Sequence, residues 1–240
     1  MSWELLHFAD ESALANAAAE QWLTLLAARE AGRVYTVALS GGRIAKVFFA
    51  AVARLGKERG TDFANVHFFW ADERCVGPDD PESNYGVARA LLLDPLGIPA
   101  GQIHRLLGEA PEPEALAQAN AELGGIAFGD GRGQPVFDLI FLGMGEEGHT
   151  ASLFPGESSA VMEGPEVYRA VTTPKPPPRR ITLGYAPLAA ARQVWMLASG
   201  RGKEAALRAS LDAADATPFG RVLHTRAMTR IFTELAGFGG

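Results

Sequence analysis

Short, almost wholly apolar runs alternate with segments of helical periodicity along this chain, and this alternation limits the possible folds most strongly. The first run, Val34-Tyr-Thr-Val-Ala-Leu39, is apolar and β-branched, which is typical of a strand buried on both faces. Three further strands are predicted over 66–70, 136–142 and 194–198. Strands that alternate with helices predict βαβ units and a mostly parallel sheet covered by helices on both faces. The predicted fold class is therefore α/β.

Apolar residues at helical spacing predict the intervening helices. In the first helix Leu14, Ala18 and Trp22 recur on one face. Asp10 is placed to cap its start, and Gly32 closes the segment. The predicted helices cover residues 11–29, 44–55, 84–93, 112–123 and 204–211. Asp94-Pro95 is expected to end the third of these, because the residue before a proline disfavours helix.

Two stretches are predicted to be loops. One is the polar segment 72–83. The other is Thr173-Pro-Lys-Pro-Pro-Pro178, which cannot be helix or central strand because proline lacks a backbone donor. It joins two more strand candidates, at 167–171 and 181–185.

The 240 residues contain no internal repeat and no low-complexity linker. We therefore expect one domain over 1–240, with the region after about residue 174 as the part that could form a small lobe. We expect this domain to act as a monomer or a weak homodimer.

The charge balance and the cysteine content exclude several classes of protein. The net charge is −6, whereas sequence-independent nucleic-acid binding needs clustered positive charge. One cysteine cannot form a disulfide framework or a multi-cysteine zinc site. The apolar runs are too short and too broken to span a membrane. The acidic start, MSWELLHFADE, is unlike a signal peptide, so we expect a soluble, cytoplasmic protein without nucleic-acid or membrane partners.

Ser40-Gly41-Gly42 stands between a predicted buried strand and a predicted helix. Ligands of open α/β sheets bind outside the carboxyl ends of the strands, and exposed backbone N–H groups at a helix start favour an anion. The spacing of a P-loop is absent. Arg43 follows directly and favours the anion further. A tight turn without a ligand is the alternative.

Asp72-Glu73-Arg74 follows the second predicted strand. At a strand end, such a cluster can place a cation and one or two carboxylates around a ligand. The alternative is a solvated loop with a local ion pair.

The run Gly143-Met-Gly-Glu-Glu-Gly-His149 follows the third predicted strand. It matches the dinucleotide-binding spacing literally, but Glu146 and Glu147 would repel a pyrophosphate, and no acidic ribose partner stands about 20 residues on. His149, on a glycine-flanked loop beside a carboxylate, is instead a candidate general base. A structural histidine is the alternative. The other histidines are interpreted as structural, and since none has metal-ligand spacing, no metal is predicted; they are His7, His67, His104 and His224.

Lys203 follows a predicted strand and precedes a predicted helix, where an ammonium group can hold a phosphate. Arg179 and Arg180 follow the proline-rich loop and could add bidentate contacts. An acidic chain whose candidate site carries Arg74, Arg180 and Lys203 suits a small anionic substrate.

Several motifs, which stand along the chain in the family's order, resemble the 6-phosphogluconolactonase family, whose superfamily also holds glucosamine-6-phosphate deaminase. The matching stretches are Leu39-Ser-Gly-Gly42, Trp70-Ala-Asp-Glu-Arg74, Ser83-Asn-Tyr85, Asp138 to Pro155, Pro174-Lys-Pro-Pro-Pro, Arg180-Ile-Thr182 and Gly200-Arg-Gly-Lys203. The resemblance implies a single three-layer α/β/α domain with a Rossmann-like sheet. It also implies hydrolysis of 6-phospho-D-glucono-1,5-lactone, the second step of the oxidative pentose phosphate pathway, without a metal or cofactor.

The resemblance suggests roles for the candidate residues. His149 would activate water, Glu147 would orient His149, and Asp72 would share that role or position substrate hydroxyls. The residues that would hold the 6-phosphate are Ser40, Gly41, Gly42, Arg43, Arg74, Arg180 and Lys203. Two alternatives stay open: the deaminase, whose Phe-Asn-Glu-Pro signature is missing here, and a non-catalytic sugar-phosphate sensor.

The sequence departs from the family pattern at three places. Ile44-Ala45 replaces a Thr-Pro at the predicted helix start, which leaves the backbone anion site usable. Glu147 stands where Asp is usual, one methylene longer. The ending Phe232-Thr-Glu-Leu lacks the usual Trp-x-Leu-Asp pattern, which we expect to affect packing more than chemistry.

Overall fold

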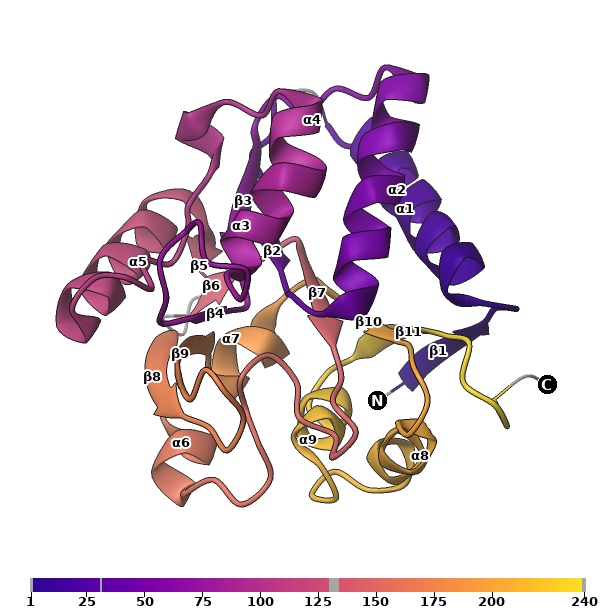
Figure 1. Cartoon of the computed structure of the whole chain (residues 1–240), viewed down its shortest axis with the longest axis vertical. Coiled ribbons are helices and arrows are strands. Elements are labelled where there is room, and N and C mark those ends of the chain that lie inside the picture. The colour runs from indigo at the N-terminus through magenta and orange to yellow at the C-terminus, as the bar shows by residue number, and fades with distance from the viewer. Residues whose placement is uncertain (1, 31, 130–133, 239–240) are drawn as a thin grey trace.

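A six-stranded sheet forms the centre of the molecule, in a computed structural model that describes residues 2–30, 32–129 and 134–238. Its order is β1-β11-β10-β7-β2-β3, and every neighbouring pair is parallel (Figure 1). The strands are β1 (Ser2–His7), β2 (Tyr35–Leu39), β3 (Val66–Trp70), β7 (Leu139–Gly143), β10 (Gln193–Ala198) and β11 (Met228–Thr233). The expected α/β class with a mostly parallel sheet is confirmed.

The four apolar runs form four adjacent strands, β10, β7, β2 and β3. The other two, β1 and β11, were not predicted from the sequence. Both interleave polar and apolar residues, as SWELLH and MTRIFT. β1 is the partly exposed edge strand, whereas β11 pairs on both sides and is exposed mainly at its start, at Met228.

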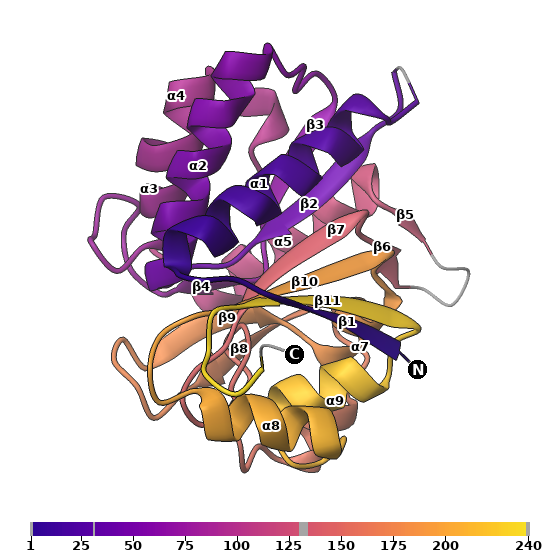
Figure 2. The same ribbon diagram turned by 90° about the vertical axis from the view of Figure 1, so that its right-hand side faces the viewer.

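Helices cover both faces of the sheet, which gives the expected three-layer α/β/α arrangement. Figure 2 shows α1 to α4 on one face and α8 and α9 on the other. The helices of the first face are α1 (Glu11–Ala27), α2 (Arg43–Arg59), α3 (Asn84–Ala88) and α4 (Asp94–Leu96). The remaining helices are α5 (Glu112–Ile126), α6 (Ser159–Glu163), α7 (Tyr185–Ala190), α8 (Glu204–Asp212) and α9 (Pro218–His224), with a 3-10 turn at Ala100–Gln102.

The helix predicted over 84–93 does not end at Asp94-Pro95. A π-helical turn, Arg89–Leu93, follows α3 and leads into α4. Pro95 is accommodated directly after this π-helical turn, where the helical hydrogen-bond pattern is already irregular. The segment ends only at Gly97, which is left-handed with φ 65°.

The segment 72–83, predicted to be a loop, begins with a strand. β4 (Asp72–Arg74) pairs antiparallel with β9 (Arg179–Leu183), which pairs with β8 (Tyr168–Thr172). In this second sheet Arg74 lies opposite Arg180. β4 was missed because its three polar residues show no strand pattern without their distant partner. A two-stranded ladder joins β5 (Phe128–Gly129) and β6 (Pro135–Val136).

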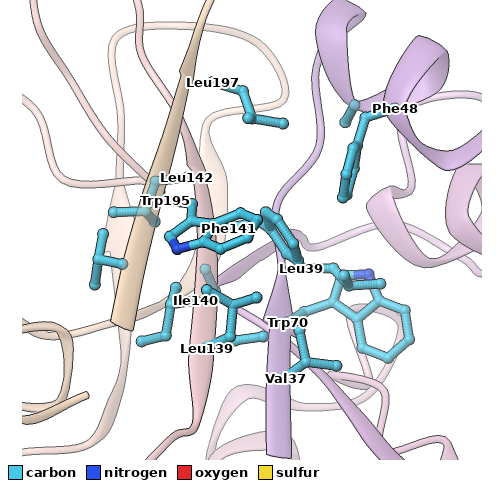
Figure 3. Packing of buried hydrophobic residues seen from close by; sticks show 14 of the residues in the cluster. Val37, Leu39, Phe48, Trp70, Leu139, Ile140, Phe141, Leu142, Trp195 and Leu197 are labelled. Carbon is cyan, nitrogen blue, oxygen red and sulfur yellow. The ribbon is translucent and has the colours of Figure 1, made fainter. Parts of the chain in front are cut away.

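Buried aromatic and aliphatic side chains pack around the central strands (Figure 3). Phe141 of β7 lies 4.5 Å from Phe48 of α2 and 5.1 Å from Trp22 of α1, measured between ring centroids. Trp195 meets Phe141 at 5.7 Å. Because the strands are buried on both faces, they lack the alternation of a half-exposed strand.

Asp138 fixes the register of β7 against β2. Its buried carboxylate accepts from the backbone N–H of Thr36 at 2.9 Å and pairs with Arg33 and Arg192. The amino-terminal ends of β2 and β7 are thereby held side by side.

No helix in the described part of the chain has the length and apolarity needed to cross a membrane.

Candidate active site

The candidate site lies at the point where the order in which strands are added to the sheet reverses. From β2 the chain adds β3 on one side and β7, β10 and β11 on the other, and ligands of open α/β sheets bind at such a switch point. A cleft opens at the carboxyl ends of β2 and β7. Its described lining residues are Ser40, Gly41, Gly42, Arg43, Ile44, Asp72, Arg74, Asn84, Gly143, Met144, His149, Ala151 and Lys203.

The Ser40-Gly41-Gly42 turn forms one end of the cleft. Gly42 caps α2 with φ 101°, a backbone conformation that favours glycine. Within the described structure no side chain caps this helix, so its first N–H groups face the cleft and favour an anion. Gly41 packs on Asn84, where a Cβ would lie 1.8 Å from Oδ1.

Three cations border this turn. Arg43 begins α2 and lies so close to the loop after β10 that a Cβ on Gly200 would be 1.8 Å from its Nη2. Lys203 precedes α8, and burial and Arg43 lower its pKa while Glu234 and Glu146 oppose the shift. Arg74 donates to the backbone oxygen of Glu82 at 2.8 Å and pairs with its carboxylate at 3.1 Å.

His149 occupies the other end of the cleft. Its Nδ1 lies 3.2 Å from Oε2 of Glu147, and its ring stacks on Phe154 with centroids 4.2 Å apart. In the described structure the Nδ1 contact is not aligned as a hydrogen bond, which is common for catalytic pairs before substrate binds. The site needs a glycine at Gly145, where a Cβ would be 2.0 Å from Nδ1.

Burial lowers the pKa of His149, while the Glu147 carboxylate acts to raise it. The imidazole is therefore neutral at neutral pH and can accept a proton. Burial of Glu147 would raise its own pKa, but hydrogen bonds from Lys175 and the backbone, together with His149, bring it down to about 2. The carboxylate is thus ionised.

Asp72 faces different partners. Its Oδ2 accepts from the Ser152 hydroxyl at 2.7 Å, and Nδ2 of Asn84 donates to its backbone oxygen at 2.9 Å. The geometry therefore assigns Glu147, and not Asp72, as the carboxylate in contact with His149.

Arg180 lies beside the site and not among the described residues that line the cleft. It is buried, and its Nε donates to Pro177 O at 3.0 Å while Nη2 donates to Lys175 O at 3.2 Å. Its guanidinium lies 5.7 Å from the Phe154 ring centroid, on the ring that stacks on His149. The structure thus brings together every predicted phosphate-binding residue except this one.

Sequence reasoning gave no role to Asn84, Ser152 or Lys175, although all three lie in the matching motifs. Asn84 lines the cleft and Ser152 holds Asp72. Lys175 lies on the proline-rich loop, and its Nζ donates a hydrogen bond to Oε2 of Glu147. The signal that could have found Lys175 is the single lysine within the proline run.

The remaining histidines have structural partners. Nδ1 of His67 lies 2.9 Å from Nε2 of His104, and Nδ1 of His104 lies 3.0 Å from Oε2 of Glu122. His7 and His224 each contact a backbone oxygen. Among the described residues no group of three or more His, Cys, Asp or Glu is arranged to hold a metal ion.

The chain matches the family model described as glucosamine-6-phosphate isomerases/6-phosphogluconolactonase over residues 9–231. The chain belongs to this family. Proteins named 6-phosphogluconolactonase from Mycobacterium tuberculosis and Mycobacterium leprae are 36% and 34% identical to it. The matches cover 90% and 89% of this chain and 88% of each relative.

Solved structures share the fold over nearly the whole chain. The crystal structure of a devB protein is 31% identical with a TM-score of 0.86, covering 97% of this chain and 96% of that one. The 6-phosphogluconolactonase of Trypanosoma brucei is 28% identical with a TM-score of 0.83 and the same coverage. A monomeric glucosamine-6-phosphate deaminase, 19% identical with a TM-score of 0.78, shares the fold.

Proposed function

We propose that this protein is an enzyme that hydrolyses 6-phospho-D-glucono-1,5-lactone to 6-phospho-D-gluconate, the second step of the oxidative pentose phosphate pathway. Its family membership and its relatives named 6-phosphogluconolactonase support this function. The observation that carries it is one cleft with an anion-binding helix start at one end and a histidine–carboxylate pair at the other.

In this proposal the 6-phosphate binds at the Ser40-Gly41-Gly42 turn. The free N–H groups of α2 and the Arg43 side chain would hold its oxygens, with Arg74 and Lys203 adding positive charge. Because the phosphate is remote from the lactone carbonyl, its binding energy serves to place C1 near His149.

His149 then acts as the general base. Nε2 takes a proton from water as the water oxygen attacks C1, and the carbonyl electrons move onto oxygen. When the tetrahedral intermediate collapses, the C1–O5 bond breaks and imidazolium returns its proton to O5. The product is the open-chain acid, which ionises in solution. A base of this kind contributes typically about 10²–10⁴-fold.

Glu147 keeps the Nδ1 proton of His149 in place and stabilises the imidazolium. Asp72 belongs to the substrate side: its carboxylate lies in the cleft lining with Asn84. We assign it to positioning the sugar hydroxyls.

The test is to generate the lactone in situ by oxidising glucose 6-phosphate and to follow acid release at neutral pH. The rate above spontaneous opening is compared for the wild type and His149→Ala. Acceleration that vanishes in the variant supports the activity and the base together. Acceleration that persists removes His149 as the base, and no acceleration overturns the function. Ammonia release from glucosamine 6-phosphate, measured in parallel, would identify a deaminase instead.

We further propose that residues 1–240 act as one domain in the cytoplasm, as a monomer or weak homodimer. No nucleic-acid or membrane partner is proposed. Size-exclusion chromatography with light scattering tests the oligomeric state.

A further inference from the structure

Lys175 reaches the catalytic loop from a distant part of the chain. Its Nζ lies 2.7 Å from Oε1 of Glu147 and 2.9 Å from Oε2. Oε2 is also the oxygen that lies 3.2 Å from Nδ1 of His149. One ammonium group therefore contacts both oxygens of the carboxylate that faces the histidine.

The backbone beneath Lys175 is anchored from two sides. Arg180 donates to the backbone oxygens of Lys175 and Pro177. Thr173 closes the proline-rich loop, its N–H donating to Pro178 O at 2.8 Å and its hydroxyl to Lys175 O at 3.1 Å. The loop thus presents the lysine from a fixed base, although the side chain is 47% exposed.

Glu147 needs such a partner to stay against His149. Its side chain is 32% exposed, so water competes for its oxygens, and its contact with Nδ1 is not aligned as a hydrogen bond in the described structure. An ordinary exposed ion pair contributes little. An ion pair that fixes the orientation of a catalytic carboxylate can nevertheless change the catalytic rate without changing the free energy of unfolding.

We propose that Lys175 is a positioning residue that holds the Glu147 carboxylate against Nδ1 of His149, so that Nε2 remains the proton acceptor. Because His149 serves as the base only under the proposed function, the role of Lys175 is tested first without substrate.

The charges around His149 make this role measurable. Glu147 and Asp72 act to raise the pKa of His149, and Lys175 acts to lower it, against the larger effect of burial. The Arg180 guanidinium lies 5.7 Å from the centroid of the Phe154 ring, which stacks on the imidazole. The effect of Glu147 on this pKa exceeds that of Lys175. A bystander Lys175 and a positioning Lys175 therefore predict shifts of opposite sign.

The experiment is an NMR titration of the His149 ring in the wild type, Lys175→Met and Glu147→Gln, with the resonance assigned from His149→Ala. If Lys175 positions Glu147, the pKa of His149 falls in Lys175→Met, as it does in Glu147→Gln, because the carboxylate is released. A rise, as expected on removing a nearby positive charge, or an unchanged pKa overturns the proposal.

Lys57→Met is the matched control, since Lys57 is an exposed lysine in the last turn of α2, and it should leave the His149 titration unchanged. In the Glu147→Gln background, Lys175→Met should no longer lower the pKa of His149. Unchanged titration of the other histidines shows that each variant is folded.

Kinetics then connect the contact to catalysis. Lys175→Met should lower kcat about three- to tenfold, with KM within about twofold, and Lys175→Arg should restore most of kcat. A raised KM with unchanged kcat would mean direct substrate contact and would overturn the positioning role. Failure of the proposed function itself shows separately, as a wild-type rate no faster than the spontaneous opening of the lactone, and loss of the base role of His149 shows as a His149→Ala rate equal to the wild type.

Discussion

The two ends of the cleft are built from different ranges of the chain. The anion-binding end centres on one continuous stretch, Ser40 to Arg43, in which a strand, a turn and a helix start follow each other directly, and Arg74 and Lys203 join it from distant parts of the chain. The histidine end combines the loop after β7 with Lys175 and Arg180 of the second sheet region, about 26 to 33 residues later in the chain.

The two ends of the cleft should therefore tolerate substitution of a side chain differently. The anion-binding end relies on backbone N–H groups and several cations, so the loss of one side chain leaves the others. The histidine end relies on single contacts arranged in series, from Lys175 to Glu147 to His149. Substitutions at the first end should alter KM, and those at the second end should alter kcat.

The largest expected effect is that of His149→Ala. We expect kcat to fall by about 10²–10⁴-fold, because the base is lost, with little change in KM. Steady-state kinetics on the freshly generated lactone measure both constants. A large rise in KM with intact kcat would place His149 at the binding end instead.

Lys203→Ala should mainly change KM and not kcat. We expect KM to rise about 10- to 100-fold, since a partly buried charge contact to a phosphate is lost, while kcat changes much less. Arg201→Ala is the control, because Arg201 is an exposed cation on the same loop. Equal effects of the two substitutions would show that only the general charge of the loop matters.

Glu147→Gln should lower kcat about tenfold and move the pH profile. The base is neutral His149, so activity is lost as pH falls through its pKa, which burial already lowers. Glu147 acts to raise that pKa, so its removal shifts the acidic limb of kcat/KM to still lower pH. If the acidic limb of kcat/KM stays at the same pH, Glu147 does not act on the pKa of the base, and the assigned role of Glu147 is wrong.

The smallest expected effect is that of Arg180→Lys, which distinguishes the structure from the sequence-based expectation. Since Arg180 holds the loop that carries Lys175, we expect kcat to fall about threefold and KM to stay within about twofold. A KM that rises as much as in Lys203→Ala would restore the phosphate-binding role.

Much of the fold could be read from local pattern. The four apolar runs became adjacent strands, and the Ser40-Gly41-Gly42 turn begins α2 as expected. Local pattern failed where an element depends on its partner. β1 and β11 mix polar and apolar residues and pair with each other, and β4 is a strand only because β9 pairs with it.

The candidate site divides in the same way. Its chemical groups were evident in the sequence, since His149, Glu147 and Asp72 each follow a strand directly or on a short loop. The sequence did not show that Glu147, and not Asp72, contacts His149. Nor did it show that Arg180 bonds the proline-rich loop.

The sequence alone determined the periodicities, the glycine turn and the types of reactive side chain, because these depend on neighbours a few residues apart. Only the tertiary structure decided which of those side chains meet. Contacts such as Lys175 with Glu147 join residues far apart in the chain, and they exist only after the second sheet and the strand ends have packed around one cleft.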